Sequence, residues 1–146
     1  MAIKITLRGL GEVRDALPEI PKTIERAVLD RMSQIAFDEA HGGATRHNQT
    51  GALSQSLFNR AIPGGREVGH DLQRAPHALF VNWGTRPHII RPKDKKSLRW
   101  AAGGRFIFAK FVKHPGYVGD PYLVRAADAA IRQFAAIVED ALKEAR

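Results

Sequence analysis

The first residues of the chain alternate between apolar and polar side chains. From Ala2 to Leu7, isoleucine or leucine occupies every second position, and lysine and threonine stand between them. A period of two residues is typical of a β-strand with one buried face. Gly9 and Gly11 follow and predict the end of this strand. The pattern therefore predicts an N-terminal strand over residues 2–7.

Two longer segments repeat their apolar residues with the period of a helix. From residue 12 to about residue 40 the pattern is helical, but Pro18 and Pro21 must interrupt it, which predicts a short helix before a longer one. A second long helix is predicted from Pro121 to about Lys143, with an alanine-rich apolar stripe. Asp120 is its expected N-cap and Pro121 its first-turn residue.

Shorter elements are predicted between these helices. Gly51 precedes a helical turn and a strand that together span residues 52–62, and residues 66–70 are the expected hairpin partner. Pro76 and Gly84 bracket a two-turn helix, whose expected buried side carries Leu79, Phe80 and Trp83. We expect further strands over 98–101 and 106–112. Pro115 and Gly116 then predict a type II turn.

Two segments lack a periodic pattern. Residues 41–49 contain two glycines and several polar side chains, and we expect a mobile, exposed loop there. Residues 86–96 contain prolines that force extended backbone before them, which predicts an ordered arm. The order of elements does not alternate regularly between strand and helix. It predicts a single α+β domain over residues 1–146, with a small antiparallel sheet packed by two long helices.

The positive charge of the chain is concentrated in one segment. The formal net charge is +8, and residues 86–113 hold nine basic residues and one acidic residue, so the remaining chain is neutral. Such a segment suits a polyanion, an acidic protein surface or the wall of a passage for DNA, although a solvated strand edge would look the same. The candidate contact residues are Arg86, Arg91, Lys93, Lys95, Lys96 and Arg99.

The usual signatures of enzymes are weak in this sequence. There is no cysteine, and no two of the six histidines stand three or four residues apart, so no local motif predicts a metal site. No serine lies in a G-x-S-x-G motif, and no phosphate-binding loop is present. We therefore expect no enzymatic activity and no cofactor, and a histidine-dependent hydrolase is the least favoured alternative. The start of the chain lacks a signal-peptide pattern, which predicts a protein made in the cytoplasm without membrane attachment.

Nucleic-acid binding is the main chemical alternative. Four aromatic residues, namely Trp100, Phe106, Phe108 and Phe111, are interleaved with the basic residues, as in strand surfaces that stack bases. However, aromatic residues on one side of a strand more often belong to the core. On that interpretation Phe106 and Phe108 are buried, and the lysines form the outer face of the same sheet.

Six short motifs occur in an order that resembles a family of bacteriophage minor tail proteins. These motifs are T-G-x-L-x-x-S at 50–56, A-P-H-A-x-x-V-x-x-G-T at 75–85, P-H-x-I-x-P-K at 87–93, L-x-W at 98–100, V-x-H-P-G at 112–116 and P-Y-L-x-x-A at 121–126. The resemblance covers roughly Leu7 to the C-terminus. At Asn82 and Trp83 the family more often carries an acidic residue followed by phenylalanine or tyrosine, which leaves the role of a charge at position 82 in doubt.

The resemblance implies a structural protein of the virion. Such proteins are small tail-completion or head-tail joining components, located in the tail or neck and assembled in the bacterial cytoplasm. They usually act as homo-oligomeric rings, and an isolated subunit can stay monomeric until its partners are present. The expected partners are other tail or neck proteins, with a passing contact to phage DNA. The motifs consist of glycine, proline and aromatic residues, which specify turns and packing.

Overall fold

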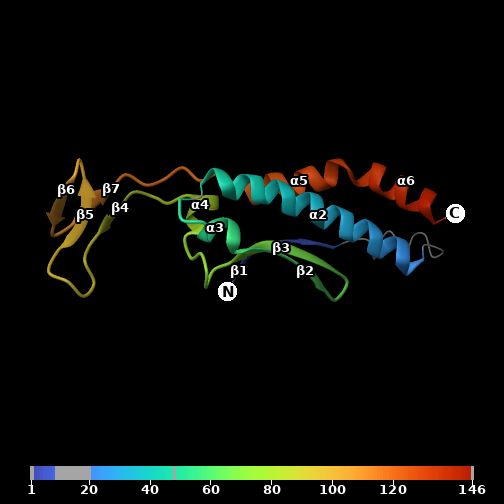
Figure 1. Cartoon of the computed structure of the whole chain (residues 1–146), viewed down its shortest axis with the longest axis horizontal. Coiled ribbons are helices and arrows are strands. Elements are labelled where there is room, and N and C mark those ends of the chain that lie inside the picture. The colour runs from blue at the N-terminus through green and yellow to red at the C-terminus, as the bar shows by residue number, and fades with distance from the viewer. Residues whose placement is uncertain (1, 9–20, 48, 146) are drawn as a thin grey trace.

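The computed structural model describes residues 2–8, 21–47 and 49–145. Its α+β architecture agrees with the fold class that the sequence predicts. Figure 1 shows long helices layered over a small sheet, and a thin arm that extends away from them. We call the arm residues 85–117, and we call the described remainder of the chain the body. The first, short helix expected within residues 12–20 lies outside the described residues.

The sheet of the body is antiparallel and has the strand order β1-β3-β2. Its strands are β1 (Ala2–Leu7), β2 (Leu57–Ile62) and β3 (Gly65–Asp71). Ile3 pairs with His70 and Ile5 with Val68. Because opposed residues of antiparallel strands share a face, these side chains point together toward the helices. The predicted strand over 2–7 and the predicted hairpin are therefore confirmed.

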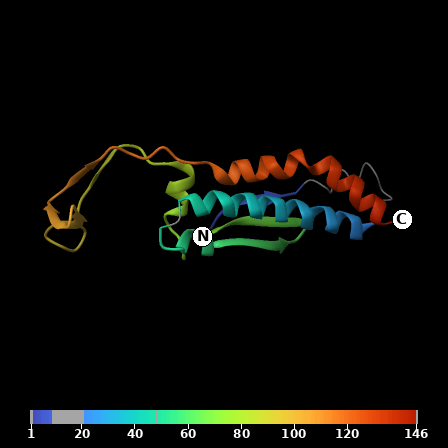
Figure 2. The ribbon, with the colours of Figure 1, turned by 45° about the horizontal axis from the view of Figure 1, so that its top comes forward.

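One helical layer covers one face of this sheet. Helix α2 (Lys22–Arg46) packs mainly on β2 and β3, α5 (Tyr122–Arg132) lies beside α2 and contacts β1, and α6 (Phe134–Glu144) lies along α2. Figure 2 shows the same layers from a second direction. The core is formed by apolar side chains from the sheet and the helices, and its most deeply buried members include Val28, Leu53, Val68, Tyr122 and Leu123.

Helix α2 continues through most of the segment that was expected to be a loop. Residues 41–46 are helical, so the prediction of a loop over 41–49 is wrong there, and residue 48 lies outside the described residues. Gly43 allows the close approach of α5, because a Cβ atom at Gly43 would lie 2.4 Å from Cβ of Tyr122. The Thr45 hydroxyl donates a hydrogen bond to the carbonyl of His41 at 2.8 Å. Helix packing thus overrides the local preference of glycine for loops.

The C-terminal helix differs from the prediction in two ways. It is divided at Gln133, whose amide donates to the carbonyl of Ala130 at 3.2 Å, three residues back. Its N-cap is Pro121, so the prediction of Asp120 as N-cap is wrong. The carboxylate of Asp120 contacts His47 and Arg125 instead of the helix backbone. The side chain thus serves to connect α5 to the end of α2.

The remaining short elements lie close to their predicted positions. Gly51 has a φ of 87° and precedes α3 (Ala52–Gln55). Pro76 lies ahead of α4 (Ala78–Trp83), and Gly84 follows it with a φ of 79°. The arm contains β4 (His88–Ile90), β5 (Leu98–Ala102), β6 (Arg105–Ala109) and β7 (Val112–His114). The single strand expected over 106–112 is therefore divided into parts of β6 and β7.

Candidate assembly interface

The arm leaves and rejoins the body at one point. A bridge between Thr85 and Tyr117 joins its two ends, with N–H···O distances of 2.8 and 3.0 Å. Beyond this bridge β4 pairs with β7, and farther out β5 pairs with β6. Figures 1 and 2 both show the β5–β6 hairpin at the end of the molecule opposite the C-terminus. The hairpin is thus presented away from the body.

Glycines hold the root of the arm in close backbone contact. A Cβ atom on Gly119 would lie 2.4 Å from the amide nitrogen of Gly84 and 2.4 Å from the carbonyl carbon of Trp83. Gly116, after Pro115, has a φ of 90°, and a Cβ atom there would lie 2.6 Å from the carbonyl oxygen of Thr85. Only glycine lets these chain segments approach so closely. Of the turn and cap residues predicted from the sequence, Gly84, Pro115 and Gly116 therefore lie at this root.

The arm exposes all six candidate contact cations. Arg86 lies near the root, and the other five lie from the end of β4 to β5; the six are Arg86, Arg91, Lys93, Lys95, Lys96 and Arg99. None of them forms an ion pair with a carboxylate among the described residues. A hollow of about 660 Å³ is lined by residues 92–99 and Phe108. The hollow therefore brings together four of the six cations, namely Lys93, Lys95, Lys96 and Arg99, with Asp94 among them.

The aromatic residues of the hairpin are exposed rather than buried. Phe106 and Phe108 are 61% and 62% exposed, so the prediction that they belong to the core is wrong. In the β5–β6 register, Arg99 opposes Phe108, and Trp100 opposes Ile107. Because side chains alternate between the faces of a strand, Arg99, Phe106 and Phe108 share one face and Trp100 and Ile107 share the other. Apolar side chains thus cover both faces of the hairpin.

The reason for this exposure is the arrangement of the sheets. The hairpin is a two-stranded sheet with no helix or second sheet packed against it within the described chain. An isolated pair of strands is marginally stable in water because it cannot bury an apolar face by itself. The guanidinium of Arg99 lies 4.5 Å from the Phe106 ring centre, and that of Arg91 lies 5.7 Å from the Phe111 ring centre. These contacts shield only part of the ring surface.

Helix α4 extends the apolar surface to the root of the arm. Leu79, Phe80 and Trp83 are exposed, which contradicts their predicted burial, and the buried residues of α4 are Ala78 and Asn82. The helix therefore packs through its smaller side chains. An apolar hollow of about 420 Å³ is found at this root, lined mainly by Phe80, Ile90, Tyr117, His77, His88 and His114.

Asn82 has a role that the sequence motifs did not reveal. Its side-chain oxygen accepts a hydrogen bond from the amide of Leu123 at 3.2 Å, in the first turn of α5. That amide has no partner within its own helix, so the contact caps α5 from α4. The only signal in the sequence was a polar residue between apolar neighbours in a short helix.

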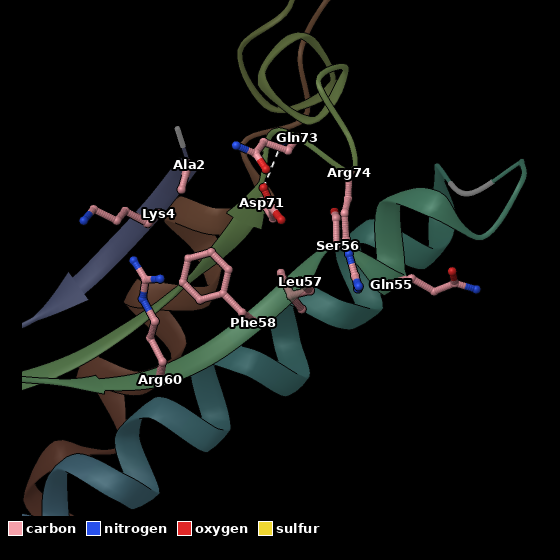
Figure 3. A pocket seen from close by; sticks show the side chains of 10 residues that line it. All are labelled: Ala2, Lys4, Gln55, Ser56, Leu57, Phe58, Arg60, Asp71, Gln73 and Arg74. Atoms are coloured by element: carbon pink, nitrogen blue, oxygen red, sulfur yellow. Dashed lines mark hydrogen bonds between the residues drawn. The ribbon is translucent and has the colours of Figure 1, made fainter.

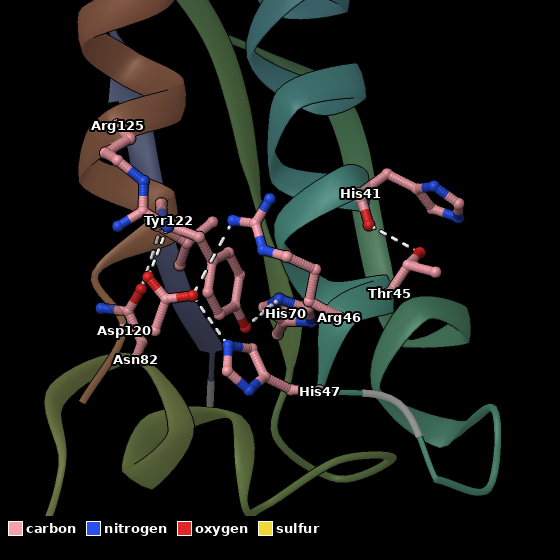
Figure 4. Close-up of polar contacts among 10 residues, drawn as sticks. His41, Thr45, Arg46, His47, His70, Asn82, Asp120, Tyr122 and Arg125 are labelled. Atoms are coloured by element: carbon pink, nitrogen blue, oxygen red, sulfur yellow. Dashed lines mark hydrogen bonds and ion pairs between the residues drawn. The ribbon is translucent and has the colours of Figure 1, made fainter. Parts of the chain in front are cut away.

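A cluster of half-buried and exposed polar residues connects α2 and α5 near the root. Asp120 accepts a hydrogen bond from Nε2 of His47 at 2.7 Å and another from Arg125, and Arg46 lies 3.8 Å away (Figure 4). Burial alone would raise the pKa of Asp120, but the hydrogen bonds from His47 and Arg125 hold it below its ordinary value. This carboxylate is therefore an anchor between α2 and α5.

The open face of the sheet carries a second polar cluster. Glu67 is buried beneath Lys4 and Arg60, and hydrogen bonds from these two residues hold the pKa of the Glu67 carboxyl below its ordinary value. A hollow of about 690 Å³ lies beside this cluster, and Figure 3 shows its polar lining. Because Lys4 and Arg60 already pair with Glu67, they are less available to an incoming anion than the arm cations.

Among the described residues, no three histidine or acidic side chains come together where they could hold a metal ion. Within that part, no helix has both the length and the apolar character needed to cross a membrane.

Comparisons with protein-family models, with curated proteins and with solved structures found no match for this chain.

Proposed function

We propose that this protein is a structural subunit that assembles with its neighbours through the arm, and that it serves as a minor tail or tail-completion component of a bacteriophage. The exposed hairpin carries the proposal: it presents apolar side chains on both faces and lies beside cations that pair with no described carboxylate. The order of the motifs along the chain supports the choice of a phage component.

The physical chemistry of the arm favours a protein partner. A burial of apolar surface stabilises by about 25 cal/mol per Å², so the exposed rings of Phe106 and Phe108 gain free energy only in a contact outside their own chain. Large exposed apolar patches commonly mark such contacts. A hairpin with apolar side chains on both faces suits insertion between neighbouring subunits.

The cations would act together with this apolar surface. In a closed ring, each subunit contributes one arm, and repetition multiplies weak contacts. Arms repeated in this way would line a channel for DNA or dock on acidic surfaces of the tail tube or neck. Such contacts near the head-tail junction would complete the tail for joining to a capsid.

Reversing the charge of the arm tests this function. In the parent phage, Arg91, Lys93, Lys95 and Lys96 are all replaced by glutamate, and lysates are examined by electron microscopy. We expect a folded protein, because these side chains are exposed and form no ion pair with a described carboxylate, but also filled heads separate from tails. Normal infectious particles would contradict the proposal.

A matched control has the same change of charge on the body. Arg8, Lys22, Arg74 and Arg132 are also exposed, and no ion pair joins them to a carboxylate among the described residues. Replacing these four by glutamate should leave particle assembly intact. Loss of assembly in both variants would indicate a general charge effect, which would contradict a specific role of the arm.

The exposure of Phe106 and Phe108 also favours a second candidate, binding of single-stranded nucleic acid. Aromatic rings beside cations can stack bases while the cations contact phosphates, and Arg99 already lies on the same face as both rings. This alternative predicts binding by the isolated monomer. It also predicts that affinity falls steeply with salt, because phosphate contacts release counterions.

Replacing the two phenylalanines separates this candidate from the first. Each stacked base contributes about 1–3 kcal/mol, so Phe106→Ala together with Phe108→Ala should weaken binding to a single-stranded oligonucleotide by at least tenfold. Fluorescence anisotropy at several salt concentrations provides the measurement. If the wild-type protein does not bind the oligonucleotide at low salt, this candidate is excluded.

A further inference from the structure

A line of apolar side chains is exposed along the outer side of α5 and α6. Val124, Ile131 and Leu142 are 41%, 60% and 41% exposed, and the half-buried Val138 belongs to the same line. Each of the four comes directly after a buried residue of its helix, namely Leu123, Ala130, Ile137 or Ala141. All four therefore lie on the same side of the buried face. These four residues form what we call the α5–α6 stripe.

A carboxylate lies within this stripe. Asp128 is four residues after Val124 and three before Ile131, so its side chain is a neighbour of both on the helix surface. Asp128 is exposed and forms no ion pair within the part of the chain that the structure describes. Arg132, four residues after Asp128, is an exposed cation on the same side of α5. The stripe therefore combines exposed apolar surface with one carboxylate and, at its border, one cation.

The hairpin of the arm has the complementary composition. Phe106 and Phe108 share a face with Arg99. An aromatic side chain offers about 150–250 Å² of surface for burial. Two phenyl rings match two aliphatic side chains in polarity, and the adjacent guanidinium of Arg99 finds a partner of opposite charge in the carboxylate of Asp128.

The charge distribution disfavours contact between two arms. Residues 86–113 carry eight excess positive charges, so two arms placed face to face would repel each other. The remaining chain is neutral, and its carboxylates include Asp128 on the stripe. A basic arm is therefore better matched to the stripe than to a second arm.

The position of the arm requires that such a contact involve another molecule. The hairpin extends from the end of the body opposite the C-terminal end of α6 (Figures 1 and 2). The arm consequently points away from the stripe of its own chain. Each copy then offers one arm and one stripe, and contacts between different surfaces generate rings or filaments.

We propose that the arm of one copy docks its Phe106 and Phe108 face on the α5–α6 stripe of a second copy, with Arg99 opposite Asp128. This inference rests on the proposed function and names the partner of the arm as the same chain. It goes further by assigning the receiving surface and a head-to-tail orientation.

Two variants of the full chain, each disabled on one surface, test the contact. The arm variant carries Phe106→Glu and Phe108→Glu, and the stripe variant carries Val124→Lys and Ile131→Lys. All four positions are exposed, so both variants should keep the circular dichroism spectrum of the wild type. Molar masses are measured by sedimentation at up to about 1 mM protein, where a contact with a dissociation constant near 1 mM is populated.

Head-to-tail docking predicts a specific result for the mixture. The wild type should form oligomers, and each variant alone should remain a monomer. An equimolar mixture should form a one-to-one dimer and nothing larger, because only the arm of the stripe variant and the stripe of the arm variant remain intact. Val118→Lys, at a position that is 92% exposed outside both surfaces, should assemble like the wild type.

Several outcomes would overturn the inference. A wild type that stays monomeric at 1 mM, a stripe variant that assembles normally, or a mixture without the dimer would each exclude docking on the stripe. Electron microscopy of phage that carries each variant distinguishes this failure from failure of the proposed function. If only the arm variant blocks particle assembly, the arm binds another virion protein and the proposed function stands; normal particles with both variants contradict both.

Discussion

The hydroxyl of Tyr122 and Nε2 of His70 are joined by a hydrogen bond of 2.8 Å inside the body (Figure 4). Nδ1 of His70 lies 2.8 Å from Oγ of Ser56, and the Ser56 hydroxyl donates to the carbonyl of Leu53 at 2.7 Å. Since that hydroxyl proton is already used, Nδ1 of His70 must carry the proton and donate to Ser56. The neutral imidazole then accepts from Tyr122 through Nε2. This chain of hydrogen bonds connects α3, β3 and α5.

The buried histidine predicts a loss of stability in mild acid. Burial lowers the pKa of His70 from 6.5 to about 4. A hydrogen bond with the backbone of Leu53 raises this pKa, but its effect is smaller than that of burial. Between these two values the unfolded chain binds a proton that the folded chain does not. The free energy of unfolding should therefore fall by up to about 1.4 kcal/mol per pH unit as the pH decreases through this range. Urea denaturation at several pH values measures it.

A substitution of His70 isolates its contribution. His70→Gln should lower the free energy of unfolding at pH 7. It should also remove the part of the pH dependence of this free energy between pH 6.5 and 4 that comes from His70. The carboxyls of Asp120 and Glu67, whose pKa values are lowered, add their own loss near the lower end of this range in both proteins. His41→Gln, on the exposed side of α2, should keep the wild-type slope. An unchanged slope in His70→Gln would contradict this assignment.

Adjacent glycines in α2 should respond in opposite directions to alanine. A Cβ atom on Gly43 would lie 2.4 Å from Cβ of Tyr122, so Gly43→Ala should force α2 and α5 apart and destabilise by about 1–3 kcal/mol. A Cβ atom on Gly42 would meet nothing within 4 Å. Gly42→Ala should therefore stabilise by about 0.5–1 kcal/mol, because alanine loses less conformational freedom in a helix.

Chemical denaturation of the two glycine variants provides the comparison. Each variant contains a single glycine-to-alanine change, and the two changes are one residue apart in the same helix. The two proteins therefore have the same composition, and each serves as the control for the other. Equal shifts of the two midpoints would show that α5 does not pack on Gly43 as described. Because Tyr122 also contacts His70, the Gly43 variant should in addition weaken the pH dependence attributed to that histidine.

Removing apolar surface from the arm should affect stability far less than removing it from the core. Phe106→Ser and Phe108→Ser act on exposed rings of the arm, and the melting temperature should change little. Leu53→Ala acts on a buried side chain and should cost about 2–5 kcal/mol, through lost contacts and a cavity. A large loss of stability in either serine variant would contradict the exposure of the hairpin.

The root of the arm should be sensitive to a single methyl group. Gly119→Ala would place Cβ 2.4 Å from atoms of Gly84 and Trp83, both of them backbone, which cannot move independently. We expect a change in the direction of the arm relative to the body. A distance distribution between spin labels on the hairpin and on α6 measures this change. An unchanged distribution would show that the glycine contacts do not set the direction.

The prediction of local structure from the sequence succeeded where short-range chemistry decides it. Alternation specified β1, and Gly84 and Gly116 adopt the positive φ angles that their turns require. The prediction failed at Gly43, where the packing of Tyr122 extends a helix through an apparent loop. It also missed Asn82, since its partner, the amide of Leu123, is distant in the sequence.

The sequence predicted only part of the candidate site. It identified the cations of residues 86–99 from the concentration of basic residues in one segment, because charge is a property of each residue. The burial of Phe106 and Phe108 could not be decided in that way, because a pattern of aromatic residues in a strand is the same whether or not another layer covers it.

By itself, the sequence determined the α+β class, the strands of the body, several turns and the concentration of charge in one segment, because these depend on neighbouring residues and their order. Only the tertiary structure decided that this segment projects from the body and exposes its aromatic side chains. Burial depends on which elements meet in space, and the hairpin extends away from the body, so none of the described helices or sheets covers its aromatic side chains.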